Sequence, residues 1–136
     1  MADEIIKDVT LAVPIERVWS ALTNPASMQG WLGPDNKLSV DLKVGGKYVI
    51  FDGETTGAFT QIDKPNLLEY TWRQSTWDAN WPDSIVRWEL TPNSTGTNVR
   101  LSHTRFPNTD ERDNHDEGWD IYFLEPLEDY LDGGIE

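Results

Sequence analysis

The two ends of this chain constrain its fold more than any other feature. Residues 5–13 alternate apolar and polar side chains like a half-buried strand, and residues 15–23, after Pro14, carry apolar side chains on one helical face. A longer helical pattern covers residues 110–131 and stops at Gly133-Gly134. Short strand-like runs separated by turn residues fill the space between. The sequence therefore predicts an α+β fold, in which a curved antiparallel sheet of six or seven strands wraps around a long C-terminal helix.

Proline and glycine mark the expected boundaries inside the first half of the chain. Asn24-Pro25 should end the helix at residues 15–23, and residues 25–31 are long enough for a second short helix. Gly45-Gly46 lies between two strand-like runs and should form a two-residue hairpin turn. Two short helices after the first strand, followed by a meander of strands, are therefore expected.

The C-terminal helix contains one residue that does not suit a helix. Thr109 or Asp110 is expected to cap its N-terminus. Pro126 lies within the apolar stripe of the helix, where its missing N–H should leave the carbonyl of Tyr122 without its usual partner. We therefore expect the helix to bend near this position.

Length and composition restrict the classes of function. A chain of 136 residues suits one domain, residues 1–136, and the absence of cysteine excludes disulfide and thiolate chemistry. No apolar run reaches the roughly 18 residues of a membrane span. The N-terminus has no signal-peptide pattern, so a cytoplasmic protein is expected.

The net charge of −13 is concentrated near the C-terminus, where residues 110–136 hold eleven acidic side chains and one basic one. An acidic surface repels phosphate backbones, so no nucleic-acid partner is expected. The acidic region has two interpretations, a solvated helix face or a docking surface for a basic protein partner.

Strand parity predicts which side chains face the C-terminal helix. Tyr70 and Trp72 share one face of a strand with Leu68, and charged side chains occupy the opposite face. The resulting wall is aromatic with a few polar points, which is typical of a small-molecule pocket and equally of a filled core. The predicted ligand-binding cavity residues are Trp31, Tyr70, Trp72, Ser84, Trp88, His103, Trp119, Tyr122 and Phe123.

Motifs that carry chemistry are few. The chain has no GxSxG elbow, no phosphate-binding loop and no GxGxxG fingerprint. His103 and His115 lie on different predicted elements without metal-ligand spacing, so neither a metal nor a cofactor is expected. His103 should face the concave side, either as a core histidine, as a polar anchor for a ligand, or as a general acid or base. No catalytic residue is predicted, and an enzyme is the less favoured interpretation.

Several segments together resemble a known family. They are Pro14–Pro25, Trp31, Asp41–Gly46, Gly57, Pro65–Trp72, Gly96-Thr97, His103 and Gly118-Trp119. In this order they resemble the Aha-type proteins, named for the activator of the Hsp90 chaperone's ATPase, within the START-like (SRPBCC) superfamily. The resemblance implies a helix-grip fold of the START/Bet v type. It implies less about function, because the superfamily hosts lipid carriers, polyketide cyclases, hormone receptors and a co-chaperone.

Four functions follow as expectations. The first is a non-enzymatic module that binds a small apolar or aromatic molecule, lipid-like or polyketide-like, between the sheet and the C-terminal helix. The second is a protein-interaction module, such as a chaperone ATPase cofactor in the stress response, that uses the acidic region. The third is a cyclase- or hydrolase-type enzyme using His103. Stacking of sugars on Trp77 and Trp81 ranks last, because no convergent carboxylates accompany these residues.

Overall fold

The computed structural model describes residues 4–33 and 36–132. Its strands are β1 (Ile5–Leu11), β2 (Ser39–Val40), β3 (Lys47–Ile50), β4 (Thr55–Asp63), β5 (Leu67–Gln74), β6 (Ser84–Asn93) and β7 (Gly96–Thr104). Its helices are α1 (Ile15–Thr23), α2 (Pro25–Leu32), the 3-10 turn η1 (Phe51–Gly53), α3 (Thr109–Gly118), the π-helical segment η2 (Trp119–Leu124) and α4 (Glu125–Asp132). The predicted stop at Gly133-Gly134 lies outside the described residues.

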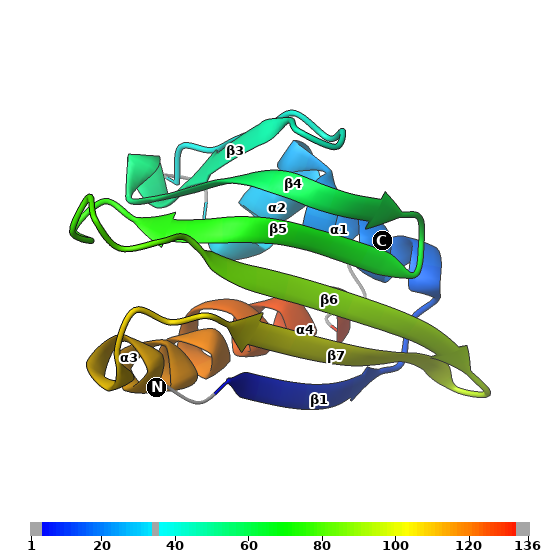
Figure 1. Ribbon diagram of the computed structural model, residues 1–136. Helices are drawn as coiled ribbons and strands as arrows, with labels where there is room; N and C mark the ends of the chain where they lie inside the picture. The colour runs from blue at the N-terminus through cyan, green and yellow to red at the C-terminus, as the bar shows by residue number, and fades with distance from the viewer. Residues whose placement is uncertain (1–3, 34–35, 133–136) are drawn as a thin grey trace.

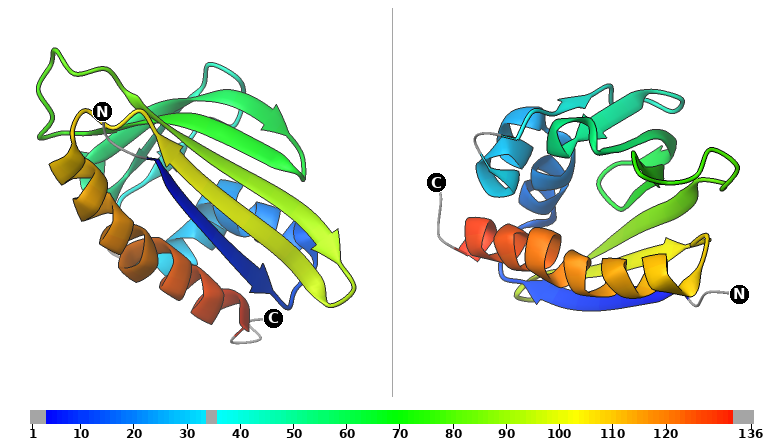
Figure 2. Two further views of the ribbon diagram at one scale, coloured as in Figure 1. Left: turned by 60° about the horizontal axis from the view of Figure 1, so that its bottom comes forward. Right: turned by 90° about the vertical axis from the view of Figure 1, so that its left-hand side faces the viewer.

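One antiparallel sheet with the order β1-β7-β6-β5-β4-β3-β2 forms the body of the protein (Figure 1). The segments α3, η2 and α4 follow one another without a break and cross the concave side of this sheet, while α1 and α2 pack at the end where α4 lies (Figure 2). The predicted α+β helix-grip fold, with seven strands and two short helices after the first strand, is therefore confirmed.

Burial along the central strands follows the predicted two-residue period. Buried side chains on β5, β6 and β7 alternate with more exposed ones, and the pairing Tyr70↔Val86↔His103 aligns the buried faces of the three strands. On α1, Val18 and Trp19 are buried against this concave face. The alternating pattern is what a sheet with one face on the core requires.

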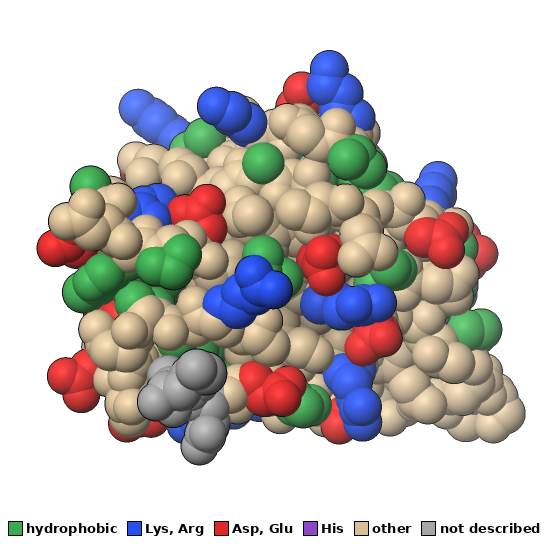
Figure 3. Space-filling model, viewed as in Figure 1, with side chains coloured by type: hydrophobic (Ala, Val, Ile, Leu, Met, Phe, Trp, Pro, Cys, Tyr) green, Lys and Arg blue, Asp and Glu red, His purple; other side chains and the backbone are tan. Residues whose placement is uncertain are grey.

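The outer face of the sheet is charged and polar. Arg87 lies 3.6 Å from Glu69 on the neighbouring strand, and Arg100 lies 2.9 Å from Asp8. Figure 3 shows Lys and Arg side chains close to Asp and Glu over this face, with hydrophobic side chains between them. Among the described residues, no helix is both long enough and apolar enough to cross a membrane.

Two local predictions are wrong, for identifiable reasons. Gly45-Gly46 does not form a two-residue hairpin turn, because β2 pairs with β3 only through Ser39↔Val49 and Val40↔Tyr48 and a wider loop joins them. A Cβ at Gly46 would lie 2.0 Å from the carbonyl oxygen of Asp41, so close backbone approach explains that glycine.

The N-cap of α3 is Asn108 rather than Thr109 or Asp110. The side-chain oxygen of Asn108 accepts the backbone N–H of Glu111 at 2.9 Å. Cap position can shift by one residue between a sequence pattern and a structure, and here Asn108 has the extended backbone that a cap needs.

The C-terminal helix departs from α geometry directly before Pro126. In η2 the backbone N–H of Glu125 bonds the carbonyl of Asp120, five residues earlier. The structure thus deviates from α geometry directly before Pro126, in the form of a π-helical segment, and the bend expected there stays a prediction. Side chains spaced by four residues drift around an α-helix of 3.6 residues per turn, and a wider π turn counteracts that drift. Buried side chains consequently recur at Trp119, Phe123, Leu127 and Leu131.

Candidate ligand-binding site between the C-terminal helix and the sheet

The deep part of the space between helix and sheet is filled by aromatic side chains. A void of about 20 Å³ remains there, next to Trp31, Tyr70, Trp88 and Phe123. The indole N–H of Trp88 donates to the Tyr70 hydroxyl at 2.9 Å, and that of Trp31 donates to the carbonyl of Ala21 at 2.8 Å. A void of this size is close to that of one water molecule. These four predicted cavity residues therefore act here as packed core.

His103 is the centre of a buried hydrogen-bond chain. The indole N–H of Trp119 donates to Nδ1 of His103 at 3.0 Å, which places the imidazole proton on Nε2. Nε2–H of His103 therefore donates to the hydroxyl oxygen of Ser84, with the nitrogen and the oxygen 2.7 Å apart, and the Ser84 hydroxyl in turn donates to the carbonyl of Trp72 at 2.9 Å. Both ring nitrogens of His103 thus have partners inside the protein.

Burial keeps His103 neutral. The side chain has 0% exposure, and burial lowers its pKa well below the ordinary 6.5, with the nearby His115 adding to the effect. Ser84 and His103 line neither the small internal void nor the open hollows at the surface. The geometry therefore corresponds to the core-histidine interpretation, in which His103 fixes Trp119 and the start of β6 at Ser84.

An open hollow of about 300 Å³ lies between the C-terminal helix and the sheet, at the end where α3 begins. We call it the aromatic hollow. Its aromatic side chains are Phe51, Trp72, Trp119, Tyr122 and Phe123. Its polar side chains are Gln74, Thr76, Glu111, Asn114 and His115. The lining thus combines aromatic and polar side chains in equal number. Small-molecule sites begin at about this volume, and their polar groups fix the orientation of the ligand.

A second, shallower hollow of about 590 Å³ adjoins it, and we call it the rim hollow. Phe51, Gln74 and Tyr122 line both, so the two hollows meet along these three side chains. The rim hollow is otherwise lined by Leu32, Gly33, Asn36, Asp52, Glu54 and Thr55.

Phe51, at the junction of the two hollows, has an uncommon backbone conformation. Phe51 and Asp52 have φ values of 53° and 59°, in the left-handed region that aromatic residues rarely adopt. The side chain of Asn36 accepts the N–H of Phe51 at 2.8 Å, and that of Asp52 accepts the N–H of Lys37 at 2.6 Å. Such strain costs about 1–3 kcal/mol per residue and concentrates at ligand sites. The segment at residues 36–37 therefore holds this turn against the mouth of the site.

His115 connects α3 to the floor of the aromatic hollow. The indole N–H of Trp72 donates to Nε2 of His115 at 3.0 Å, and Nδ1–H of His115 donates to the carbonyl of Glu111 at 2.7 Å. Burial lowers the pKa of His115, although the Glu111 carbonyl opposes the shift. At neutral pH the imidazole therefore presents no positive charge to the hollow.

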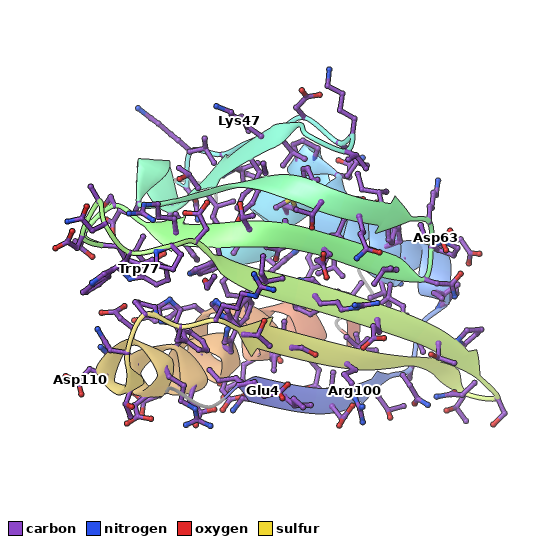
Figure 4. The ribbon with its side chains drawn as sticks, viewed as in Figure 1. Glu4, Lys47, Asp63, Trp77, Arg100 and Asp110 are labelled. Carbon is purple, nitrogen blue, oxygen red and sulfur yellow. The ribbon has the colours of Figure 1, made fainter. Side chains whose placement is uncertain are left out.

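The β5–β6 loop closes one side of the site. Trp77 on this loop donates its indole N–H to the carboxylate of Glu111 at 2.7 Å (Figure 4 labels Trp77 next to the first turns of α3). Arg73 holds the loop by donating to the carbonyls of Trp81 at 2.7 Å and Asp78 at 2.6 Å. The tryptophan pair of this loop thus packs against the protein.

The structure therefore divides the predicted cavity residues into three groups. Trp72, Trp119, Tyr122 and Phe123 meet around the aromatic hollow. Trp31, Tyr70 and Trp88 surround the small internal void, which Phe123 also borders, and Ser84 and His103 form the buried hydrogen-bond chain. Tyr122 differs from the rest because it is 62% exposed and stands at the entrance.

Sequence reasoning missed the polar residues of α3 and the residues around η1. Glu111, Asn114 and His115 belong to a helix without an apolar stripe, so no periodicity singles them out. The sequence pattern places Phe51 at the end of a strand, and no sequence signal predicts its left-handed backbone conformation. Among the described residues, no cluster of three or more potential metal ligands occurs.

Comparisons with known proteins agree with this architecture. Residues 12–132 match the family described as Activator of Hsp90 ATPase homolog 1-like protein. A solved structure from Mesorhizobium loti is 26% identical, with a TM-score of 0.83 over 98% of this chain and 100% of its own. An HSP90 activator from Plasmodium falciparum is 28% identical, with a TM-score of 0.81 over 97% of this chain and 96% of its own. CalU16 from Micromonospora echinospora is 25% identical, with a TM-score of 0.80 over 94% and 75%. A comparison with curated sequences gives no significant match.

Proposed function

The chain belongs to the family of Activator of Hsp90 ATPase homolog 1-like proteins, and from this premise we propose that it is a non-enzymatic module that binds a small apolar or aromatic molecule. The binding site in this proposal is the aromatic hollow. The observation that carries it is an open space of about 300 Å³ whose floor consists of Trp72, Trp119 and Phe123. These three rings are 3%, 2% and 6% exposed, so a ligand meets only the parts of them that face the hollow, together with the exposed ring of Tyr122. Rings held in this way need little ordering when a ligand arrives.

The hydrogen-bond network supports the proposal by keeping this floor rigid. Trp119 is anchored on His103, and Trp72 is anchored on His115. Both tryptophan N–H groups are therefore satisfied before a ligand binds, and the rings turn their faces and edges toward neighbouring aromatic side chains. A pocket organised in this way avoids much of the cost of ordering side chains on binding.

The same contacts explain why the proposal is a binding module rather than an enzyme. The imidazole of His103 is hydrogen-bonded at both nitrogens and lies outside the aromatic hollow. A general base has to reach the proton that it removes, and a ligand in the hollow does not meet this imidazole.

A pair of tryptophan substitutions on α3 tests the proposal. Asn114 lines the aromatic hollow and is exposed, so Asn114→Trp should fill the space without disturbing the core. Glu117 is exposed on the same helix outside the lining, so Glu117→Trp is the matched control. A library of aromatic and lipid-like molecules is screened by ligand-observed NMR. Molecules that bind the wild type should not bind the Asn114→Trp variant, and they should still bind the Glu117→Trp variant. Hits that bind both variants equally, or a library without hits, would contradict the proposal.

A second candidate function is docking to a chaperone, which the family description and the similarity to an HSP90 activator favour. The acidic surface of α3, which includes Asp113 and Glu117, offers a docking face for a basic partner. This function predicts that the protein stimulates the ATPase of Hsp90 and that the stimulation weakens as salt rises. Reversing both charges to lysine should reduce stimulation, whereas Glu128→Lys on α4 should not. Equal effects of both changes would speak against docking through α3.

A further inference from the structure

The two adjoining hollows have a charge pattern that selects one class of ligand. Three carboxylates, those of Asp52, Glu54 and Glu111, are among the described residues that line the hollows, and none of these lining residues is Lys or Arg. His115 does not change this balance, because its Nε2 already accepts the indole N–H of Trp72. The local potential is therefore negative, and low-dielectric walls strengthen such a potential inside a cleft.

Aromatic faces lie within the same space as these carboxylates. Glu111 accepts the indole N–H of Trp77 with Oε1 at 2.7 Å, and the same oxygen is 4.0 Å from Nδ1 of His115. The imidazole of His115 in turn contacts Trp72, with ring centres 5.8 Å apart. A carboxylate has about four lone-pair positions, so Glu111 keeps capacity for a ligand donor beside the aromatic floor.

We infer that the site prefers an aromatic molecule that carries a positively charged amine. This inference rests on the proposed function and specifies its ligand. The ring system of the ligand lies on Trp72, Trp119 and Phe123. Its ammonium group lies toward the junction of the two hollows, between Glu111 of the aromatic hollow and Glu54 of the rim hollow. Tyr122 and Phe51 stand where the two hollows meet. An ammonium that passes between them gains cation–π attraction from ring faces as well as from the carboxylates.

The opposite charge is disfavoured by the same arrangement. A ligand carboxylate or phosphate in this space would meet three like charges and no basic lining residue among those described. A neutral ligand with the same ring keeps the apolar contacts and loses only the electrostatic attraction to the carboxylates and ring faces. Three molecules that share one ring and differ in charge therefore separate the electrostatic from the apolar contribution to the binding free energy.

The probes are naphthylethylamine, naphthylethanol and naphthylacetate, with binding measured by calorimetry at low ionic strength. The amine should bind about tenfold more tightly than the alcohol, which corresponds to a modest cation–π and carboxylate contribution near a surface. The acetate should bind most weakly. Added salt should reduce the preference for the amine, because the rim carboxylates face solvent.

Matched amide variants locate the effect. Glu54→Gln and Glu111→Gln should each weaken binding of the amine about threefold to tenfold, and each should change binding of the alcohol by less than about twofold. Glutamine can still accept the indole N–H of Trp77, so Glu111→Gln should fold normally. Glu117→Gln removes the same charge from α3 outside the lining and should leave binding of the amine nearly unchanged.

Each outcome has a definite meaning. Equal affinity for the amine and the alcohol overturns this inference and leaves the proposed function standing. Equal weakening by Glu117→Gln and Glu111→Gln also overturns it, because the preference would then come from the net charge of the protein. Absence of binding by all three probes at millimolar concentration overturns it as well, and the library screen with Asn114→Trp then decides the proposed function separately.

Discussion

Replacing His103 by alanine should destabilise the protein strongly at neutral pH. The substitution leaves the buried indole N–H of Trp119 without an acceptor, which costs about 1–3 kcal/mol. It also removes a ring that packs on Phe106 with centres 4.1 Å apart, and large-to-small changes in a core typically cost about 2–5 kcal/mol. Because the site can relax in part, we expect a loss of about 3–5 kcal/mol in the free energy of unfolding.

The loss should become smaller in acid. Burial holds the pKa of His103 well below 6.5 in the folded state, so between that low value and 6.5 only the unfolded chain takes up the proton. Stability from the neutral imidazole is complete above about pH 6.5 and falls as the pH falls below it. At about pH 5.5 the wild type should therefore have lost part of the stability that the neutral imidazole contributes, whereas the alanine variant has no such contribution to lose. The difference between the two proteins should shrink by that amount.

Urea unfolding followed by tryptophan fluorescence, at about pH 7.5 and about pH 5.5, measures both effects. Ser102→Ala, on the outer side of the same strand, is the control and should change the free energy of unfolding by less than about 0.5 kcal/mol. A His103→Ala variant within about 1 kcal/mol of the wild type would refute the structural role of the network. A difference that stays constant or grows in acid would refute the neutral imidazole.

Three further predictions follow from single contacts. Trp119 is 2% exposed, so Trp119→Ala should lower the free energy of unfolding by about 3–5 kcal/mol in urea titrations, and a loss below about 2 kcal/mol would mean a loosely packed ring. Asn108→Ala should cost about 1 kcal/mol by the same assay because it removes the cap on the N–H of Glu111, whereas Asn108→Ser should retain most of the stability. Lys7 lies 2.7 Å from Asp116 and lowers the pKa of that carboxyl, so Lys7→Met should raise the Asp116 pKa in an NMR titration, and an unchanged value would contradict the ion pair.

Most of the fold could be predicted from the sequence, because the patterns that indicate its strands and helices involve residues close together in the chain. The two-residue period of the strands and the one-sided helix at residues 15–23 follow from side-chain order alone. The loop at Gly45-Gly46 could not, because its shape depends on how far β2 continues to pair with β3. A departure from α geometry near Pro126 was predictable, but its π-helical form was not, because the missing N–H of Pro126 does not show which carbonyls the neighbouring N–H groups bond instead.

The site was predictable only in part. Parity placed Trp72 on the concave face, and helical spacing placed Trp119 and Phe123 opposite it. Which part of that interior stays open depends on side-chain volumes. Tyr70 and Trp88 fill the middle of the space between helix and sheet, so only its end near α3 stays open. The opening at the start of α3 also depends on tertiary contacts between segments distant in sequence, such as residues 36–37 and the turn at Phe51.

The indole N–H resonances of the protein offer the most direct test of the central claim, that a small molecule binds at the open end of the grip. Trp72 and Trp119 line the aromatic hollow, whereas Trp31 and Trp88 border only the small internal void, so the molecule contains its own controls. In a nitrogen-15 NMR titration with a hit from the aromatic library, the signals of Trp72 and Trp119 should shift with one common saturation curve while those of Trp31 and Trp88 stay nearly fixed. Saturable shifts confined to Trp31 and Trp88, or binding that moves none of the four, would contradict the claim.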